Sequence, residues 1–272
     1  MVNKVFHGDC LEIMKSIPEG SIDMVLCDLP YGTTQCKWDV IIPFDKLWEQ
    51  YERIIKSNGV IALSASQPFT TSLIYSNLKI FKYELIWIKT MPSGLASSSY
   101  MPMKYHENIC IFIKKGKPTF NKQMQERSES GKERMKKSGK ILNGNLSSGT
   151  HNPFKDGIKN TYSEYDKTKV NPKSILEFKS VSNSGGTKLH PTQKPIELFE
   201  YLIKTYTNEN ETVLDNTAGS GTTAIACINT NRNYILIEKE QKYFDIINER
   251  IDKHNQSRVG EVLIDDLFSY AP

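Results

Sequence analysis

The chain has 272 residues, of which 38% are hydrophobic and 24% are charged, and its formal net charge is +4. This composition is close to that of ordinary globular proteins, so a sizeable core can form without disulfides and disorder is not expected. The N-terminus has no long apolar stretch, and no run approaches the roughly 18 apolar residues that a membrane span needs. Secretion and membrane insertion are therefore not expected.

The cysteines argue against two classes of small scaffold. They form no Cys-x-x-Cys pair and no alternating Cys and His spacing, which argues against a zinc module and against a disulfide framework. No metal site is predicted, and a reducing, cytoplasmic compartment fits best. The five cysteines are Cys10, Cys27, Cys36, Cys110 and Cys227.

The N-terminal part predicts strands alternating with helices. Its strands are continuous apolar runs, as parallel sheets buried on both faces require, and Asn58-Gly59 is expected to stop the second helix. A doubly wound α/β sheet is the expected architecture. The expected strands are Lys4–Phe6, Ile22–Cys27, Val60–Ser64, Tyr83–Ile88 and Asn108–Ile113, and the expected helices are Leu11–Ser16 and Phe44–Ser57.

The motif Asp28-Leu29-Pro30-Tyr31 directly follows a predicted buried strand, where open α/β sheets bind ligands. An aryl amine is a poor nucleophile because its lone pair is delocalised into the ring. The Asp28 carboxylate and the Leu29 carbonyl can each accept one N–H hydrogen bond and so hold that pair on nitrogen. Pro30 stiffens the turn, and Tyr31 offers a flat face for a base, a stacking worth about 1–3 kcal/mol. The alternative interpretation is a turn-capping carboxylate beside an aromatic at the edge of the core.

The segment from Lys114 to His190 differs from the rest of the chain. It is rich in Lys, Ser, Asn and Gly, and its 17 Lys and Arg against 7 Asp and Glu give a net charge of +10, which leaves −6 for the remainder. Because a structureless stretch of this length is unusual inside a compact domain, we expect an insertion with its own small structure or a region ordered by a partner. A solvated lysine-rich loop is the alternative.

The C-terminal part predicts a cofactor site. The run Thr212–Thr223 passes from a strand through a small-residue turn into a helix, where glycines admit close approach of a ligand and free amides favour an anionic group. Glu238 lies 19 residues beyond Gly219, near the offset at which nucleotide-binding folds place an acid against ribose hydroxyls. The expected elements are helix Ile196–Thr205, strand Thr212–Asp215, helix Thr222–Asn229 and strand Tyr234–Ile237.

These motifs together resemble the beta group of S-adenosylmethionine-dependent DNA amino-methyltransferases. Asp28-Leu29-Pro30-Tyr31 is similar to their Asp-Pro-Pro-Tyr signature, and 215–223 is similar to their cofactor motif. The order of catalytic motif, basic segment, 190–195 and cofactor motif is also similar to the beta group. Two positions depart from the pattern: Leu29 replaces the first proline, and Thr217 replaces an aromatic residue often found there.

The resemblance implies an α/β, doubly wound, mostly parallel Rossmann-like methyltransferase sheet with a basic target-recognition insertion. It divides the chain into a catalytic half at 1–113, the insertion at 114–189 and a cofactor-binding half at 190–272. The cofactor is expected to be S-adenosyl-L-methionine.

The resemblance also implies roles for single residues in cofactor binding. Asp9 and the Cys10 amide would contact the cofactor adenine, Lys194 and Thr222 the methionine carboxylate, and Asp215 the cofactor amine or an ordered water. The residues expected to bind the cofactor are Asp9, Cys10, Lys194, Asp215, Gly219, Ser220, Gly221, Thr222 and Glu238.

Double-stranded DNA is the expected partner. A target amine inside a duplex cannot reach a buried methyl donor, so the base must be flipped into a pocket, where Tyr31 and His106 are the expected contacts. The basic segment, including Lys132, Lys136 and Lys137, would neutralise phosphates. Candidates within it for reading base edges are Asn121, Gln123, Arg127 and Asn145.

Four functions are weighed. Members of the family that methylate a cytosine carbon place a nucleophilic cysteine after proline, and this chain has no Pro-Cys pair, so an exocyclic amine is the expected target. Aspartate at position 28 resembles the adenine-N6 enzymes, and cytosine N4 is the alternative. A small-molecule Rossmann-type enzyme would carry a Gly-x-Gly-x-x-Gly fingerprint that the turn at 219–224 lacks. A DNA-binding protein without catalysis is a further alternative; a homodimer and a restriction endonuclease partner are left open.

Overall fold

The computed structural model describes residues 1–34, 36–138, 166, 168–182 and 188–269, with the backbone alone over 135–138 and 259–269. The chain divides into two compact units, Met1–Asn121 with Ile175–Pro272, and Lys122–Ser174. The first unit is an α/β layered structure around one large sheet, as predicted.

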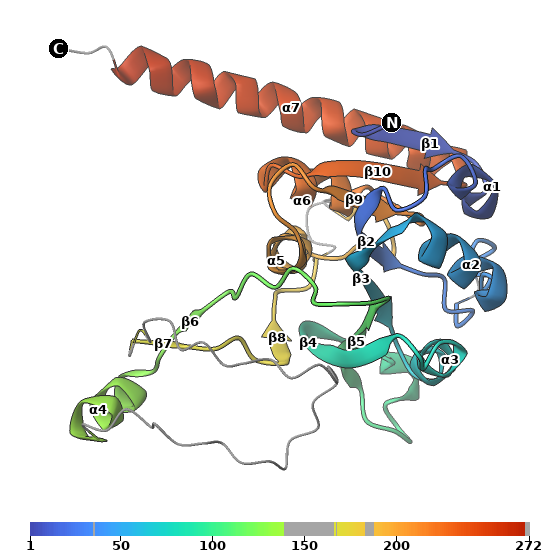
Figure 1. Ribbon diagram of the computed structural model, residues 1–272. Helices are drawn as coiled ribbons and strands as arrows, with labels where there is room; N and C mark the ends of the chain where they lie inside the picture. The colour runs from blue at the N-terminus through green and yellow to red at the C-terminus, as the bar shows by residue number, and fades with distance from the viewer. Residues whose placement is uncertain (35, 139–165, 167, 183–187, 270–272) are drawn as a thin grey trace. The chain divides into compact units, whose positions relative to one another are not determined.

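The described residues of the first unit form an eight-stranded, mostly parallel sheet (Figure 1). β5 runs antiparallel to both of its neighbours, while the pairs from β1 to β3 and the pair β4 and β8 are parallel. In spatial order the strands are β1 (Lys4–His7), β10 (Asn233–Glu238), β9 (Thr212–Asp215), β2 (Ile22–Asp28), β3 (Ile55–Ala65), β5 (Lys104–Ile113), β4 (Phe81–Ser93) and β8 (Ile175–Glu177).

Helices cover both faces of this sheet, which is why its central strands are apolar throughout. Figure 1 shows α1 (Cys10–Met14), α2 (Phe44–Ile54) and α3 (Phe69–Ser76) on one face, and α5 (Ile196–Tyr206) and α6 (Thr222–Asn229) on the other. α7 (Gln241–Ser269) packs against β1, β10 and α6. No helix of the described chain is long and apolar enough to span a membrane.

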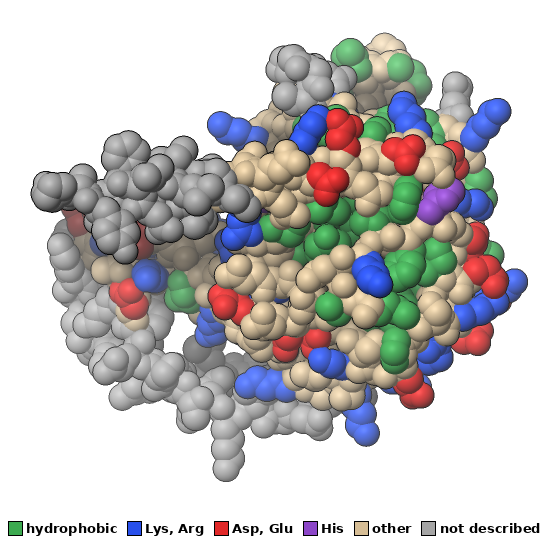
Figure 2. Space-filling model, turned by 90° about the horizontal axis from the view of Figure 1, so that it is seen from above, with side chains coloured by type: hydrophobic (Ala, Val, Ile, Leu, Met, Phe, Trp, Pro, Cys, Tyr) green, Lys and Arg blue, Asp and Glu red, His purple; other side chains and the backbone are tan. Residues whose placement is uncertain are grey.

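A large hydrophobic core lies between the sheet and the first three helices. It includes the fully buried side chains of Met14, Tyr51 and Phe112. On the face drawn in Figure 2, acidic and basic side chains are interspersed around an area of apolar side chains. Charge of one sign therefore does not dominate this face.

The boundary between α2 and β3 differs from the prediction. The helix ends at Ile54 rather than Ser57, because Ile55 already pairs with Ile22 of β2. Gly59 lies inside β3, where a Cβ would come within 2.8 Å of the Asp23 carbonyl oxygen, so its role is close backbone approach rather than helix termination. Helices α3 and α7 and the edge strand β8, which has three residues, were not predicted.

The second unit lies inside the predicted insertion. It contains α4 (Glu129–Ser138) and the short antiparallel pair β6 (Gln125–Glu126) and β7 (Lys169–Val170). The flanks of the predicted range 114–189 belong to the first unit, where Ile175–Glu177 pairs with β4 as β8.

Candidate active site

A pocket of about 370 Å³ opens at the carboxyl ends of the parallel strands of the first unit. Three acids line it, and each is the last residue of a strand: Asp28 of β2, Asp215 of β9 and Glu238 of β10. Carboxyl ends of parallel strands meet at one edge of the sheet, so residues far apart in the chain converge there. Both the turn at 28–31 and the turn at 215–220 line this pocket.

Two contacts hold the Asp28 carboxylate in the turn after β2. The Tyr31 hydroxyl donates to Asp28 Oδ1 at 2.6 Å, and the Lys194 ammonium lies 2.6 Å from Asp28 Oδ2. Burial, and then the negative charge of Asp28, raises the pKa of Tyr31 well above its usual value, so the phenol keeps its proton. The Tyr31 ring stacks on Phe69 with 5.0 Å between centroids, which fixes the ring plane, and Leu29 is buried beneath the turn.

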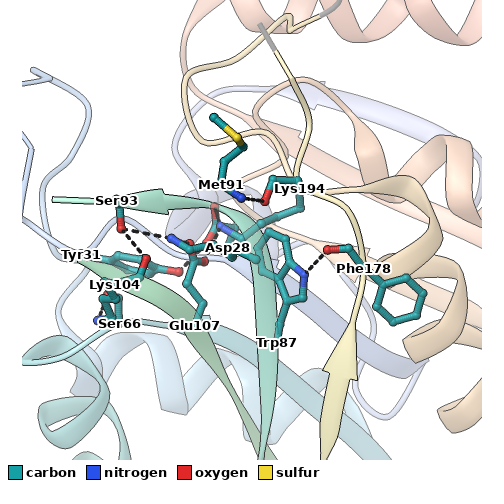
Figure 3. A network of polar contacts seen from close by, with 12 residues as sticks. Asp28, Tyr31, Ser66, Trp87, Met91, Ser93, Lys104, Glu107, Phe178 and Lys194 are labelled. Carbon is teal, nitrogen blue, oxygen red and sulfur yellow. Dashed lines mark hydrogen bonds and ion pairs between the residues drawn. The ribbon is translucent and has the colours of Figure 1, made fainter. Parts of the chain in front are cut away.

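A chain of ion pairs extends from this turn (Figure 3). Glu107 of β5 lies 3.2 Å from Lys194 and 3.2 Å from Lys89 of β4. Although burial opposes ionisation, the two lysines hold the pKa of Glu107 below its usual value. Neither Glu107 nor Lys89 was among the predicted site residues, although Glu107 is next in the chain to His106, a predicted contact of the flipped base.

Asp39 is a third residue of this region that was not among the predicted site residues. Its carboxylate accepts hydrogen bonds from the amides of Gly32, Thr33 and Thr34 at 2.9, 2.9 and 2.6 Å. Burial opposes ionisation, but these hydrogen bonds lower the pKa of Asp39. Asp39 therefore anchors the loop that leaves the Asp28 turn and lines the same pocket.

The opposite end of the pocket is formed mainly by backbone. Gly219 and Gly221 adopt positive φ angles of 54° and 75°, which turns the chain from β9 into α6. The Arg250 guanidinium of α7 donates to the Ser220 carbonyl at 2.8 Å and closes this turn. Thr222, buried at the start of α6, donates to the Lys194 carbonyl at 3.4 Å.

The two acids at this end accept hydrogen bonds mainly from the main chain. Glu238 accepts from the amides of Gly219 and Glu240, each at 2.8 Å. Asp215 accepts from the Thr217 amide at 3.1 Å and from the Thr223 hydroxyl, and burial raises the pKa of Asp215 to about 7.

Thr217 makes one of the hydrogen bonds that join the two ends. The Thr217 hydroxyl donates to the Asp28 carbonyl at 3.1 Å. Thr217 is the position where the resemblance leads one to expect an aromatic side chain, so here a hydroxyl connects the glycine turn to the Asp28 turn.

Asp9 and Cys10 lie where β1 ends and line the pocket. The Asp9 carboxylate accepts from the Leu11 amide at 3.0 Å and caps α1, with Lys239 at 3.5 Å. Cys10 is buried, and this burial raises its thiol pKa.

Two predicted contacts are placed differently from the expectation. Lys194 points its ammonium at two carboxylates, so its predicted contact with a cofactor carboxylate stays a prediction. His106 is exposed on β5 opposite Ile88 and does not line the pocket. Within the described residues, no group of three or more His, Cys, Asp and Glu side chains could hold a metal ion.

The basic residues predicted to contact DNA lie in the second unit. Lys132 of α4 pairs with Glu129 at 2.9 Å and Glu126 at 3.8 Å. Lys136 and Lys137 continue the helix, but their side chains lie outside the described part.

The candidates for reading base edges are placed by their hydrogen bonds where they are described. The Asn121 amide donates to the carbonyls of Lys204 and Thr207 and fastens the chain to the end of α5. Arg127 donates to the Lys169 carbonyl at 3.0 Å. Asn145 lies outside the described residues.

The comparisons with known proteins agree on the family. The family model described as DNA methylase, for N6 and N4 methyltransferases, matches residues 22–249. Type II methyltransferase M.HinfI of Haemophilus influenzae is 29% identical over 92% of this chain and 68% of its own length. DNA adenine methyltransferase YhdJ of Escherichia coli (strain K12) is 27% identical over 91% of this chain and 82% of its own length.

Solved structures show the same architecture. The M1.HpyAVI-SAM complex superposes with a TM-score of 0.59 at 25% identity, covering 91% of this chain and 98% of that one. The cytosine-N4-specific PvuII DNA methyltransferase, at 16% identity and a TM-score of 0.62 over 90% of this chain and 84% of its own, shares the fold. Because the family model spans most of the sequence and both of its motifs line one pocket, the chain belongs to the DNA methylase family of N6 and N4 amino-methyltransferases.

Proposed function

We propose that this protein transfers a methyl group from S-adenosylmethionine to the N6 amine of an adenine flipped out of double-stranded DNA. The observation that carries the proposal is a single pocket lined by Asp28 at one end and by the turn at 215–220 at the other. Its volume of about 370 Å³ falls in the range typical of small-molecule sites.

The Asp28 end suits an aromatic amine. Its carboxylate is held in place by Tyr31 and Lys194, and each carboxylate oxygen has a further lone pair with which to accept an N–H hydrogen bond. Acceptance of that bond by Asp28, and of a second by the Leu29 carbonyl, holds the nitrogen lone pair out of the ring. The buried position excludes water, which strengthens these bonds.

The other end suits the cofactor. S-adenosylmethionine, when bound, supplies an electrophilic methyl group on a sulfonium. It is cationic at sulfur and nitrogen, and the acids Asp28, Asp215 and Glu238 face the pocket, while the amides that begin α6 suit its one carboxylate. The residues present therefore fit the group: Glu238 would hold the ribose hydroxyls, Asp9 the adenine amine, and Asp215 the cofactor amine.

Adenine is favoured over cytosine by the catalytic turn and by the relatives. Aspartate at position 28 resembles the adenine enzymes, and the E. coli relative is named a DNA adenine methyltransferase. The PvuII enzyme shows that the same fold also serves cytosine N4. The two targets both present an exocyclic amine, so Asp28 could act on either by the same chemistry.

Sequencing that detects modified bases, applied to DNA from cells expressing the chain, tests the proposal. We expect N6-methyladenine within one short sequence motif. N4-methylcytosine in its place would establish the alternative target. Unmodified DNA, together with cofactor binding measured by calorimetry, would point to a DNA-binding protein without catalysis.

We propose that residues 114–189 bind the DNA target. The support is charge, since this range contains the excess of lysine and arginine while the rest of the chain is net acidic. Changing Lys132, Lys136 and Lys137 to alanine together should weaken DNA binding and reduce the slope of log affinity against log salt, by up to about one per lost phosphate contact. Because the Lys132 ammonium already pairs with Glu129, changing Lys132 alone should weaken DNA binding less than the triple change does. Unchanged salt dependence in the triple variant would place the DNA surface elsewhere.

Three further properties stay proposals. The five cysteines are all unpaired, which suits a cytoplasmic location. Light scattering of the purified chain tests whether it forms a homodimer, and co-purification tests whether it has a restriction endonuclease partner.

A further inference from the structure

Four alternating charges lie in a row beneath the catalytic turn. They come from separate parts of the first unit: Asp28 ends β2, Lys194 lies two residues before α5, Glu107 is in β5 and Lys89 is in β4. The ammonium of Lys194 is 2.6 Å from Asp28 and 3.2 Å from Glu107 (Figure 3). Glu107 in turn is 3.2 Å from the Lys89 ammonium. We call these residues the buried charge row.

The charge row is well shielded from solvent. The side chains of Lys194 and Lys89 are 7% and 9% exposed, and those of Glu107 and Asp28 are 16% and 18% exposed. Two carboxylates and two ammonium groups balance to zero net charge. Breaking one pair in such a place leaves an uncompensated charge, which is far more costly than losing a surface pair. The row is therefore rigid in a way that exposed ion pairs are not.

Among the described ion pairs, Lys194 connects Asp28, the member of the row that lies in the turn, to Glu107 and Lys89. Lys194 lies 6.0 Å from the centre of the Tyr31 ring as well as against Asp28, so it borders both side chains of the turn. Glu107 holds the far side of the same ammonium. The Lys194 ammonium therefore lies between two carboxylates, and its contact with Glu107 helps to fix its position against Asp28.

We propose that Lys194 and Glu107 are positioning residues for Asp28: the lysine, fixed by Glu107, orients the Asp28 carboxylate and keeps it ionised to accept the N–H of the target amine. This inference rests on the proposed function, because it gives the row a role in that reaction. It differs from the role that the resemblance implies for Lys194, which is contact with the carboxylate of the cofactor.

The electrostatics around Asp28 give the two residues opposite effects. Burial raises the pKa of Asp28; Lys194 opposes this rise and Glu107 adds to it. The remaining groups nearby are the Tyr31 phenol and Asp215 on the Asp28 side, and Lys89 and Lys104 on the Glu107 side. Substitution at 194 or 107 keeps these groups in place, but loss of the Glu107 charge alters the surroundings of Tyr31, Lys89 and Lys104.

The test compares the variants Lys194→Met and Glu107→Gln in the full-length protein. We measure the single-turnover methyl-transfer rate at saturating S-adenosylmethionine and DNA from pH 5 to 8, with cofactor affinity by calorimetry. Both variants should bind the cofactor within about twofold of the unaltered protein and transfer methyl at least about tenfold more slowly, as loss of one hydrogen bond to a charged group would give. The control is Lys204→Met, which removes a partly exposed lysine paired with Glu200 on α5.

The pH profiles separate positioning from general damage. Lys194→Met should move the acid limb of the profile to higher pH by about one to three units, because an opposite charge no longer favours the ionised Asp28. Glu107→Gln should leave that limb in place or move it to lower pH. A limb that shifts upward in both variants, or in neither, would overturn the inference, as would loss of cofactor binding in Lys194→Met.

Failure of the function and failure of the inference give different results. If the unaltered protein methylates no amine in DNA, the proposed function is wrong. If the unaltered protein is active and the variants fail the comparison of acid limbs, only the role of the charge row is wrong. If Lys194→Met does not fold, as shown by the loss of its thermal unfolding transition, Glu107→Gln alone tests the proposal. An acid limb that moves to higher pH in Glu107→Gln would contradict it.

Discussion

The two ends of the pocket are built from different materials. At the Asp28 end, side chains hold side chains: Tyr31 and Lys194 contact the carboxylate, and Glu107 holds the lysine. At the Glu238 end, the main chain holds side chains, because the amides of Gly219 and Glu240 donate to that carboxylate. One end is an arrangement of charges drawn from three strands and the loop before α5, and the other is built around a local turn with two glycines.

This difference matches the two tasks that the pocket would perform. A cofactor with hydroxyls, an ammonium and a carboxylate is recognised by fixed donors and acceptors, which a strand, turn and helix supply without long side chains. A reacting amine needs an acceptor whose charge and direction are set in advance, and buried ion pairs provide that. We therefore expect changes at the Asp28 end to alter rate and changes at the Glu238 end to alter affinity.

The largest effect should follow Asp28→Ala. Methyl transfer should fall by at least about a hundredfold to a thousandfold, the range seen when one directed polar contact to a reacting group is removed. Affinity for S-adenosylmethionine should stay within about twofold, because Asp28 would act on the base. Transfer of a labelled methyl group measures the rate, and calorimetry measures the affinity.

Asp28→Asn separates an effect on the reaction from a folding defect. Asparagine has the shape of aspartate, and Lys194 still has Glu107 as an ion-pair partner. Asp45→Ala, an exposed acid in the first turn of α2, is the matched control. Loss of cofactor binding in either Asp28 variant would mean that the two ends do not divide the work in this way.

The same difference explains what could be predicted from the sequence. The glycine turn is local, so 212–223 alone indicated a strand, a turn and a helix, and the structure has β9 and α6 with those bounds. The charge row depends on β4, β5 and the residues before α5 coming together, which no local pattern encodes. Glu107 and Lys89 were missed for that reason, and Lys194 was found only through a motif. Similarly, α2 was extended past Ile54 because pairing with β2 is a long-range contact.

The next largest effect should be on affinity. Glu238→Ala removes the proposed acceptor for the ribose hydroxyls and should weaken S-adenosylmethionine binding by about tenfold to a hundredfold, as expected for hydrogen bonds to a charged group. The rate at saturating cofactor should change much less. Calorimetry and single-turnover rates measure the two quantities separately.

Glu238→Gln should give an intermediate affinity, because one oxygen can still accept from Gly219 or Glu240. Glu249→Ala, which removes an exposed acid of α7, serves as the control. A variant at 238 that binds the cofactor normally but reacts slowly would reverse the proposed assignment of the two ends.

Asp215→Asn should have effects of opposite sign on stability and binding. Burial raises the pKa of Asp215 in the ligand-free fold to about 7, whereas an unfolded aspartate titrates near about 3.9. The folded state therefore binds the extra proton between these values, and the stability that this proton contributes is present at low pH and is lost as pH rises through 7.

Asparagine does not ionise, so the variant does not lose stability in this way as pH rises. Thermal melts should therefore show that its stability relative to the unaltered protein increases from pH 5 to pH 8. Its affinity for the cationic cofactor should instead fall by about tenfold and should no longer increase with pH. Parallel stability curves for the two proteins would contradict a raised pKa at this position.

The smallest effect should come from loss of the Thr217 hydrogen bond, which joins the two ends. Thr217→Val keeps the shape and the amide contact with Asp215 but removes the hydroxyl that donates to the Asp28 carbonyl. A neutral hydrogen bond contributes about 0.5–1.5 kcal/mol, so we expect the methyl-transfer rate to fall by about twofold to tenfold. Cofactor affinity should be unchanged, because the loss falls on the Asp28 turn.

Thr205→Val is the matched control, since that buried hydroxyl bonds to its own helix and not to the pocket. Combining Thr217→Val with Asp28→Asn tests the link directly. If Thr217 acts through the Asp28 turn, the rate of the double variant should be no lower than that of Asp28→Asn alone. Additive losses would mean that the two ends of the pocket act independently, and that the hydroxyl at 217 serves the glycine turn instead.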